Sequence, residues 1–428
     1  MRGVYIKPVS GIKGEIVVPG DKSISHRAAL QGGMAHGETH ISNFLFGQDC
    51  LSTLRCLEQL GVSWERQGNE VWIRGEGMEA WQEPSDVLDA GNSGTTARLM
   101  LGALAGSPFA VTLTGDVSLR SRPMRRVTEP LRQMGARILG RLGGNIFPLT
   151  ISGGQLQGQS FRTTVASAQV KSAILLAGLR ASGETRVEEP SLSRDHTERM
   201  LRGFGVEVVS DKNMVRVHGG GRLTGQDVSV PGDISSAAFF LVLGSLAGRA
   251  EIFLPNVGIN PTRTGILDVL RAMGADIELS NVTEICGEPR ATLCVRNAEL
   301  RGIEIGGDMI PRLIDEIPIL AVAASLAEGI TVIRDAGELR VKETDRIRAV
   351  AEGLLALGAK VEELPDGLRI QGQPSLYGGK ASSLGDHRLA MAWAIAGLVS
   401  QEGVSVENMA AADVSYPDFL DVIKKVVR

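Results

Sequence analysis

Six stretches of the chain share one layout, and this repetition limits the folds that the chain can adopt. Each stretch begins with polar or charged residues, continues as a helix-length run of Ala, Leu, Ile and Val, and ends near a Gly. The stretches lie roughly 70 residues apart, so six similar units account for the whole chain. A helix that is apolar on all sides is typical of the buried centre of a domain. The six stretches start at Gly20, Gly91, Ser167, Gly232, Asp315 and Gly385.

A second pattern recurs with the same period. Five segments, such as CLEQLGVSWE and VLRAMGADIE, predict an amphipathic helix that ends near a Gly and is followed by a strand. Glycine after the last helical residue is a typical helix C-terminus. The sixth copy, FLDVIKKVVR, closes the chain and has no such Gly. Each unit therefore predicts a buried helix, an amphipathic helix and several alternating strands, which is an α/β architecture.

The domain organisation follows from the size of these units. Three units make a block of roughly 210 residues, which is the size of one domain, so we expect two similar domains. The segment VPGD occurs at Val18–Asp21 and again at Val230–Asp233, each time as a strand, a Pro-Gly turn and a helix start. We expect the chain to cross between domains at these points. One domain then comprises residues 1–20 plus 232–428, and the other residues 21–231.

Composition narrows the class of ligand. The net charge is −4, which gives no overall attraction to nucleic acid or to an anionic membrane surface. A site for an anion must therefore be a local concentration of Lys and Arg. The four cysteines show no CxxC or metal-ligand spacing, and we expect reduced thiols in a cytoplasmic protein. No apolar run approaches the ~20 residues that span a bilayer.

Several catalytic motifs are missing from the sequence. There is no Walker A loop, no Rossmann GxGxxG followed by a suitable acid, no GxSxG elbow and no metal-ligand cluster. The remaining cations, acids and small polar residues can orient anionic substrates and move protons. We therefore expect chemistry that uses no cofactor and no metal.

The polar starts of the predicted buried helices have two interpretations. Ser23, Asn92, Ser93 and Ser167 can each be an ordinary helix N-cap or a ligand for an anion at the helix N-terminus. Lys22 fits capping poorly, because a cation in the first turn opposes the helix dipole. Arg27 follows in the same helix. These charges indicate a site for a multiply anionic small molecule, which we expect between the domains.

Three further stretches add positive charge. The segment LRSRPMRRV has four arginines close together without acid partners, which suits a bidentate grip on phosphate or carboxylate. The segment GELRVKETDRIRAV predicts a helix with Lys342 and Arg346 four residues apart. The two cations either surround an anion or are neutralised by Glu343 and Asp345 on a solvated face. The segment GDHRLAMAW sets Arg388 at the start of another buried helix.

These segments together resemble the 5-enolpyruvylshikimate-3-phosphate (EPSP) synthases, and the resemblance covers essentially the whole chain. It implies transfer of the enolpyruvyl group of phosphoenolpyruvate to the 5-hydroxyl of shikimate 3-phosphate, in the shikimate pathway of aromatic amino acid biosynthesis. It also implies two domains, each of three βαβαββ units, an active site in the interdomain cleft, no cofactor and a monomer. The matching segments are PGDKSISHRA, GNSGTTARL, LRSRPMRRV, SAQVKSA, RDHTERML, PGDISSAAF, NPTRTG, DEIPILAVAA, LRVKETDRI and DHRLAMA.

The resemblance also implies the role of particular residues. Three are candidates for proton transfer in an addition–elimination reaction, namely Lys22, Asp315 and Glu343. Shikimate 3-phosphate is expected to contact Lys22, Ser23, Arg27, Ser167, Ala168, Gln169, Arg194, Asp315 and Lys342. Phosphoenolpyruvate is expected to contact Lys22, Gly94, Arg122, Gln169, Arg346 and Arg388. Many members also carry a Lys just before the final strand, and the corresponding region here, VENMAAADVSYPDF, has none.

Three alternatives are weighed against this interpretation. Many enolpyruvyl transferases that act on UDP-N-acetylglucosamine carry a reactive Cys in the loop matching LRSRPMRRV, and this loop has none. An RNA 3′-phosphate cyclase needs a nucleotide-accepting His near its C-terminus, where the chain offers only His387 in a helix-start motif. A protein that only binds an anion would not need Lys22, Arg122 and Glu343 together.

Overall fold

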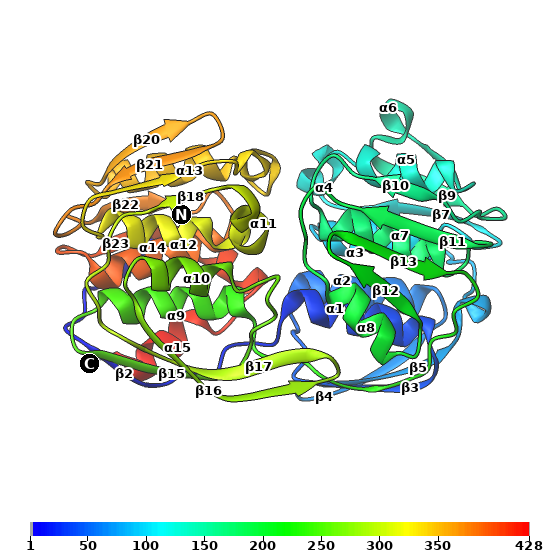
Figure 1. Ribbon diagram of the computed structural model, residues 1–428, viewed down its shortest axis with the longest axis horizontal. Helices are drawn as coiled ribbons and strands as arrows, with labels where there is room; N and C mark the ends of the chain where they lie inside the picture. The colour runs from blue at the N-terminus through cyan, green and yellow to red at the C-terminus, as the bar shows by residue number, and fades with distance from the viewer. Residues whose placement is uncertain (1–2, 428) are drawn as a thin grey trace. The chain divides into compact units, whose positions relative to one another are not determined.

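The computed structural model describes residues 3–427, and the contacts within it divide the chain into two units (Figure 1). Unit 1 comprises residues 3–19, 231–284 and 289–427, and unit 2 comprises residues 20–230 and 285–288. The chain thus passes from unit 1 to unit 2 after Pro19 and returns after Val230. The short segment Ile285–Glu288 is a part of unit 2 that no sequence pattern indicated.

Unit 2 contains three four-stranded sheets within the described residues. In each sheet an edge pair is parallel and the other two pairs are antiparallel. The sheet orders are β14 (Asp227–Ser229), β3 (His36–Ser42), β5 (Glu70–Glu76), β4 (Ser63–Gln67); β6 (Leu88–Asp89), β7 (Ala110–Thr114), β9 (Ile146–Ser152), β8 (Arg137–Gly140); and β10 (Ser160–Arg162), β11 (Glu184–Glu188), β13 (Met214–His218), β12 (Val208–Asp211).

Unit 1 repeats this plan in the part of the chain that the structure describes. Two of its sheets have four strands and the third has three. Their orders are β16 (Asp276–Ile285), β17 (Glu288–Arg296), β15 (Ala250–Gly258), β2 (Ile12–Glu15); β18 (Glu304–Ile305), β19 (Ile330–Ile333), β21 (Gly367–Gln371), β20 (Lys360–Leu364); and β1 (Val4–Ile6), β23 (Val404–Glu407), β22 (Gly379–Ser382).

The six predicted buried helices are all present and begin at or within four residues of the expected starts. They are α1 (Lys22–Met34), α3 (Gly94–Leu104), α7 (Ala168–Gly178), α9 (Ile234–Leu246), α12 (Ile317–Ser325) and α14 (His387–Val399). Four of these helices connect two parallel strands, as a parallel pair requires a crossover connection. The other two, α1 and α9, precede a strand whose parallel partner comes from a distant part of the chain. The predicted α/β fold of βαβαββ repeats is therefore confirmed.

The amphipathic helices complete each repeat. Five of these helices were predicted to end near a Gly, and in all five that Gly has a left-handed backbone conformation. Examples are Gly61 at φ 89° and Gly274 at φ 102°. Glycine adopts this conformation without the steric penalty that other residues incur. The helices are α2 (Gln48–Gln59), α5 (Arg125–Gln133), α8 (His196–Gly203), α10 (Gly265–Ala272), α13 (Arg346–Ala356) and α15 (Phe419–Val426).

The first strand of the first repeat in each unit comes from a distant part of the sequence. In unit 2 this place beside β3 is taken by β14, and in unit 1 the place beside β15 is taken by β2. The N-terminal strand β2 thereby belongs to a sheet formed by the later half of the chain. In each unit, a strand from one end of the unit pairs with a strand from the other part. The exchange explains why the VPGD segments stand at the crossings.

Each unit has one apolar core made largely of small aliphatic side chains. Buried helices α3 and α7 pack closely where they meet. A Cβ atom on Gly102 of α3 would lie 2.3 Å from the backbone oxygen of Ala173 in α7, so only glycine allows this approach. None of the helices in residues 3–427 is long and apolar enough to cross a membrane.

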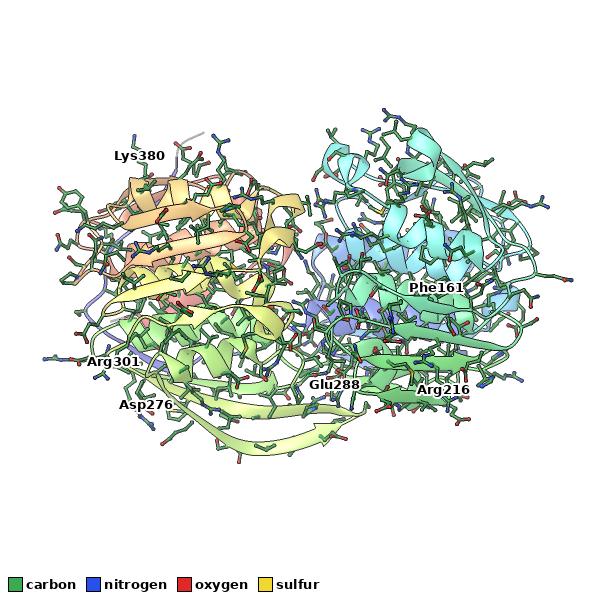
Figure 2. All side chains as sticks on the ribbon, turned by 45° about the horizontal axis from the view of Figure 1, so that its top comes forward. Phe161, Arg216, Asp276, Glu288, Arg301 and Lys380 are labelled. Atoms are coloured by element: carbon green, nitrogen blue, oxygen red, sulfur yellow. The ribbon has the colours of Figure 1, made fainter. Side chains whose placement is uncertain are left out.

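The tip of the β16–β17 hairpin is held by polar contacts within unit 2. His196 Nδ1 lies 2.8 Å from Glu288 Oε1, and both side chains are buried. Arg199 donates a hydrogen bond of 2.7 Å to the carbonyl of Gly287. Glu288 is among the side chains labelled in Figure 2. A buried imidazole–carboxylate contact at this point fixes the tip, because either group alone would be costly to desolvate.

Candidate active site

The charge at the start of α1 is balanced inside unit 2. Asp21 caps the helix, accepting a 2.9 Å hydrogen bond from the Ile24 N–H, so Ser23 is not the cap. Lys22 is the first helical residue, and its Nζ lies 3.1 Å from Asp49 Oδ2 on α2. Asp49 offsets the unfavourable position of a cation in the first turn. The side chain of Lys22 remains only partly buried.

Arg27, one turn further along α1, is buried and connects three helices. Its Nε donates to Thr197 Oγ1 of α8 at 2.6 Å, and one terminal nitrogen donates to Ser172 Oγ of α7 at 2.9 Å. The other terminal nitrogen donates to the Ser23 carbonyl at 3.0 Å. These three acceptors are uncharged, so they orient the guanidinium while leaving its positive charge in place.

A second group of polar contacts surrounds the N-terminus of α3. Arg98 donates to Gln169 Oε1 at 2.7 Å and to the Gly94 carbonyl at 3.3 Å. Gln169 in turn donates from Nε2 to Thr95 Oγ1 at 2.9 Å. A Cβ atom on Gly94 would lie 2.7 Å from Arg98 Nη1 and 3.3 Å from Arg122 Nη1. The structure therefore brings Gly94, Arg122 and Gln169 together, as expected, and adds Arg98.

The arginine-rich segment divides between helix and loop. Arg122 follows the short helix α4 (Val117–Ser121) and donates to Asn92 Oδ1 at 2.8 Å. The expectation that the four arginines have no acid partner is wrong for Arg125, whose Nε lies 3.2 Å from Glu129. Helix α5 begins at Arg125 and places Glu129 one turn away, where an ion pair forms readily. The other two, Arg120 and Arg126, are exposed.

A buried ion-pair network lies beneath the start of α7. The Nζ atom of Lys171 lies 2.9 Å from Glu189 Oε2 and 2.8 Å from Glu198 Oε1, and all three side chains are buried. Glu189 also accepts hydrogen bonds from the Ser167 N–H at 2.9 Å and from Ser193 Oγ at 2.7 Å. Burial alone would lower the pKa of Lys171, but Glu198 and Glu189 outweigh it and raise that pKa.

This network positions the remaining expected residues of unit 2. Ser167 directly precedes α7, Ala168 and Gln169 lie in its first turn, and all three are half-buried. Arg194, also half-buried, directly follows Ser193, whose carbonyl accepts a hydrogen bond from Lys171 Nζ at 3.3 Å. The Ser167 side chain makes no capping hydrogen bond, and the Ser167 backbone N–H donates to the Glu189 carboxylate.

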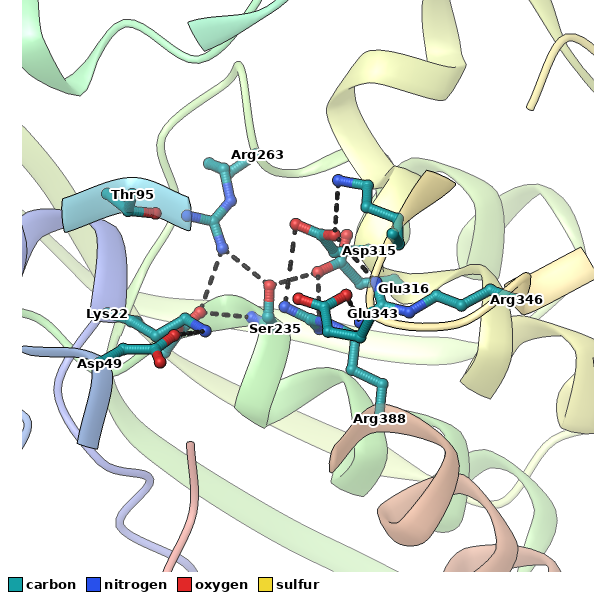
Figure 3. Close-up of polar contacts among 12 residues, drawn as sticks. Lys22, Asp49, Thr95, Ser235, Arg263, Asp315, Glu316, Glu343, Arg346 and Arg388 are labelled. Atoms are coloured by element: carbon teal, nitrogen blue, oxygen red, sulfur yellow. Dashed lines mark hydrogen bonds and ion pairs between the residues drawn. The ribbon is translucent and has the colours of Figure 1, made fainter. Parts of the chain in front are cut away.

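In unit 1, three cations surround the carboxylate of Asp315 (Figure 3). Asp315 Oδ1 lies 3.5 Å from Lys342 Nζ and 3.3 Å from Arg346 Nη1, and Oδ2 lies 3.8 Å from Arg388 Nη2. Glu343 is 2.7 Å from Arg346 Nη2. Two carboxylates capable of proton transfer therefore share one guanidinium.

Arg346 is held by a deeper carboxylate as well. Its Nε and Nη2 donate to the two oxygens of Asp386 at 2.7 and 3.2 Å, a bidentate arrangement that fixes the guanidinium plane. Burial would lower the pKa of Arg346, but Asp386, Glu343 and Asp315 outweigh it and raise that pKa. Burial would raise the pKa of Asp386, but Arg346 outweighs it and lowers that pKa. Both groups are therefore charged.

The predicted helix through Lys342 and Arg346 is wrong. A short 3-10 helix ends at Val341, and α13 begins only at Arg346, because Asp345 caps it by accepting a 3.2 Å hydrogen bond from the Arg348 N–H. Lys342 thus lies outside the helix. The anion between the two cations is nevertheless present, since Asp315 contacts both.

Residues beyond the expected set complete this group. Glu316 lies 3.8 Å from Arg388 Nη1 and accepts a hydrogen bond from Ser235 Oγ. Arg263 donates to Ser235 Oγ at 2.8 Å and lies 3.1 Å from Asp233 Oδ1. Ser235 lies in the first turn of α9, within PGDISSAAF, and Arg263 lies in NPTRTG. Both segments were singled out in the sequence, although neither residue was given a role.

Comparison with known proteins decides the family. The model of the family described as EPSP synthase (3-phosphoshikimate 1-carboxyvinyltransferase) matches residues 6–423. The chain belongs to the EPSP synthase family. A 3-phosphoshikimate 1-carboxyvinyltransferase from Desulfitobacterium hafniense (strain DSM 10664 / DCB-2) is 68% identical over 425 residues, covering 99% of this chain and 98% of that protein. One from Bacillus cereus (strain G9842) is 54% identical over the full length of both chains.

Solved structures agree with this assignment. EPSP synthase from Acinetobacter baumannii matches with a TM-score of 0.89 and 43% identity, covering 99% of this chain and 97% of that one. The enolpyruvyl transferase NikO from Streptomyces tendae matches with a TM-score of 0.81 at 17% identity, which shows a shared fold. The prediction of an EPSP synthase, a transferase, is confirmed.

Proposed function

We propose that this enzyme transfers the 1-carboxyvinyl group of phosphoenolpyruvate to the 5-hydroxyl of shikimate 3-phosphate, and that the two groups of residues described above act on this one pair of substrates. The products are 5-enolpyruvylshikimate 3-phosphate and inorganic phosphate. We also propose that the enzyme acts in the cytoplasm as a monomer. The family membership of the chain supports the reaction, and the residues below supply its chemistry.

In unit 2, the proposed task is to bind anions. Lys22, Ser23 and Arg27 would hold the phosphate of shikimate 3-phosphate at the N-terminus of α1, with Arg194 on the same anion. The exposed N–H groups and dipole of a helix N-terminus favour such an anion. The start of α7, at Ser167, Ala168 and Gln169, would contact the ring hydroxyls.

Phosphoenolpyruvate would be bound by residues of both groups. Gly94 leaves space beside the guanidinium groups of Arg98 and Arg122, and Gln169 is bonded to Arg98. Arg346 and Arg388 supply two further guanidiniums, which match phosphate or carboxylate in bidentate geometry. Lys22 would contact both substrates.

In unit 1, the proposed task is proton transfer. Asp315 and Lys342 would orient the 5-hydroxyl, and Asp315, Glu343 and Lys22 would exchange its proton and the one that the methylene carbon takes up. The hydroxyl oxygen bonds to C2 of phosphoenolpyruvate while C3 is protonated. Loss of a C3 proton and cleavage of the bond from C2 to the phosphate oxygen then give the products. The observation that carries this proposal is the contact of Asp315 and Glu343 with the single guanidinium of Arg346.

The decisive experiment is phosphate release by the purified protein with each substrate alone and with both together. We expect phosphate only when shikimate 3-phosphate and phosphoenolpyruvate are both present, without added metal or nucleotide. UDP-N-acetylglucosamine in place of shikimate 3-phosphate serves as the control acceptor. Phosphate release with that acceptor but not with shikimate 3-phosphate would overturn the proposed substrate.

A further inference from the structure

A cavity of about 380 Å³ lies in unit 2 at the ends of α1 and α7 opposite to the residues discussed above. Met34, which lines it, is the last residue of α1, and Lys22 is the first. A helix rises 1.5 Å per residue, so these two residues are roughly 20 Å apart along the axis. Leu179, which directly follows α7, also lines the cavity, whereas Ser167 precedes that helix. The cavity is therefore separate from the proposed substrate contacts.

One side of the cavity is apolar and fixed in place. Met34, Met78, Leu179 and Leu223 line it, and all four are buried. The backbone around them is hydrogen bonded, with the Gly220 N–H donating to the Leu179 carbonyl and the His36 N–H to the Leu223 carbonyl, both at 2.9 Å. A volume of this size lies in the range of small-molecule sites, and its lining combines apolar with polar surface.

The other side of the cavity carries more positive than negative charge. Arg180 and Arg222 line it, and neither guanidinium forms an ion pair with any residue from 3 to 427. Arg180 donates one hydrogen bond, of 3.3 Å, to the Met78 carbonyl. The one acid of the lining, Glu79, lies 3.0 Å from His36 Nε2. The lining thus has two guanidiniums and one carboxylate, which contacts the imidazole of His36.

The environment of Arg180 makes an additional anion favourable. Burial lowers the pKa of Arg180, and the nearby Glu79 offsets this only in part. A cation that is partly removed from water without a paired counter-ion is destabilised. A ligand carboxylate would supply the missing partner in the bidentate geometry that guanidinium groups prefer.

We infer that this cavity binds a small organic carboxylate with an apolar body. Arg180 and Arg222 hold its carboxylate, and the two methionines and two leucines contact the apolar part. A free inorganic anion would leave the apolar side unfilled, and a neutral apolar molecule would leave both guanidiniums unpaired. Both portions of the ligand are therefore needed.

The test uses phenylacetate as the probe and the methionine methyl groups as reporters. Titration into full-length protein labelled with ¹³C-methyl Met should shift the resonances of Met34 and Met78 saturably, with half-saturation at or below ~1 mM. Substitutions Met34→Leu and Met78→Leu assign the two signals among the twelve methionines. The titration is repeated with excess shikimate 3-phosphate, which should not reduce these shifts.

Variants and control ligands separate the two parts of the inference. Arg222→Gln, at an exposed residue, should weaken phenylacetate binding at least ~5-fold, and Arg180→Gln should do so as well. Arg137→Gln, at an exposed position on β8, should leave it unchanged. The inference is wrong if phenylacetamide or inorganic phosphate shifts both methyl signals as strongly as phenylacetate does. It is equally wrong if phenylacetate causes no saturable shift up to ~5 mM in the folded wild-type protein.

Discussion

Replacing Lys171 by Met tests whether the buried network under α7 has the role that the structure gives it. Methionine keeps an unbranched side chain of similar length but cannot neutralise Glu189 and Glu198, which lie 2.9 and 2.8 Å from the ammonium group. Both carboxylates would then remain buried without their cation. Removing one partner of a buried ion pair typically costs about 3–5 kcal/mol of unfolding free energy.

The size of the effect makes it measurable by thermal unfolding. For a unit of 150–250 residues, 1 kcal/mol corresponds to about 2–4 °C in melting temperature, so unit 2 should melt about 6–20 °C lower. The raised pKa of Lys171 determines the pH range in which this ion-pair network stabilises the folded state. The contribution of Lys171 to the free energy of unfolding is complete below the ordinary Lys pKa of ~10.4 and is lost only as the pH rises through the higher folded-state pKa. Measurements at pH 7 therefore report the full effect.

The same substitution should change substrate binding in a selective way. Glu189 holds the Ser167 N–H and the Ser193 hydroxyl, so its displacement should raise the KM for shikimate 3-phosphate more than that for phosphoenolpyruvate. Lys171→Arg, which keeps the charge, should recover most of both losses. Lys360→Met, at an exposed strand position, is the control for loss of a lysine. A melting temperature within 2 °C of wild type or an equal rise in both KM values would refute the reasoning.

Three further predictions concern two residues that would touch substrate and the carboxylate that holds Arg346. Glu343→Gln should lower kcat by at least ~100-fold in the phosphate-release assay with both KM values nearly unchanged, and near-normal turnover would remove Glu343 from proton transfer. Gly94→Ala places a Cβ atom 2.7 Å from Arg98 Nη1 and should raise the KM for phosphoenolpyruvate well above that for shikimate 3-phosphate, whereas equal changes would contradict the assignment. Asp386→Asn leaves the buried Arg346 with a weaker partner and should lower the melting temperature at pH 7. Because the pKa of Asp386 is lowered, that deficit should be present above the ordinary Asp value of ~3.9 and shrink as the pH falls through the folded-state value.

The repeat pattern predicted the buried helices well because their signal is local and strong. A run such as ISSAAFFLVLGSL has no polar face, so it can only lie inside a domain, and it forms α9. The strands were harder to place, because pairing depends on distant residues. The VPGD segments placed residues 1–20 with the later half of the chain, but they gave no strand pairing. The pairing of β2 with β15 and of β14 with β3 joins segments about 190–240 residues apart in the chain.

The sequence identified several charged residues of the site, but it did not identify their ion-pair partners. Lys22 was recognised as out of place in a first helical turn, yet its partner Asp49 lies 27 residues away on another helix. No sequence pattern indicated the contact between Lys171 and Glu189, because only the folded structure buries these two residues together. The misplaced start of α13 is different, since the capping residue Asp345 was visible in LRVKETDRIRAV. In that segment the charge pattern was given more weight than the helix-start signal.

The pairing of cations with Asp315 has a chemical consequence under the proposed function. Lys342, Arg346 and Arg388 all contact Asp315. An incoming phosphate or carboxylate competes for these same cations, so each contact that it gains weakens one that Asp315 had. A carboxylate that loses positive neighbours holds a proton more readily. Under the proposed function, binding of the anionic substrate would therefore make Asp315 a better proton acceptor.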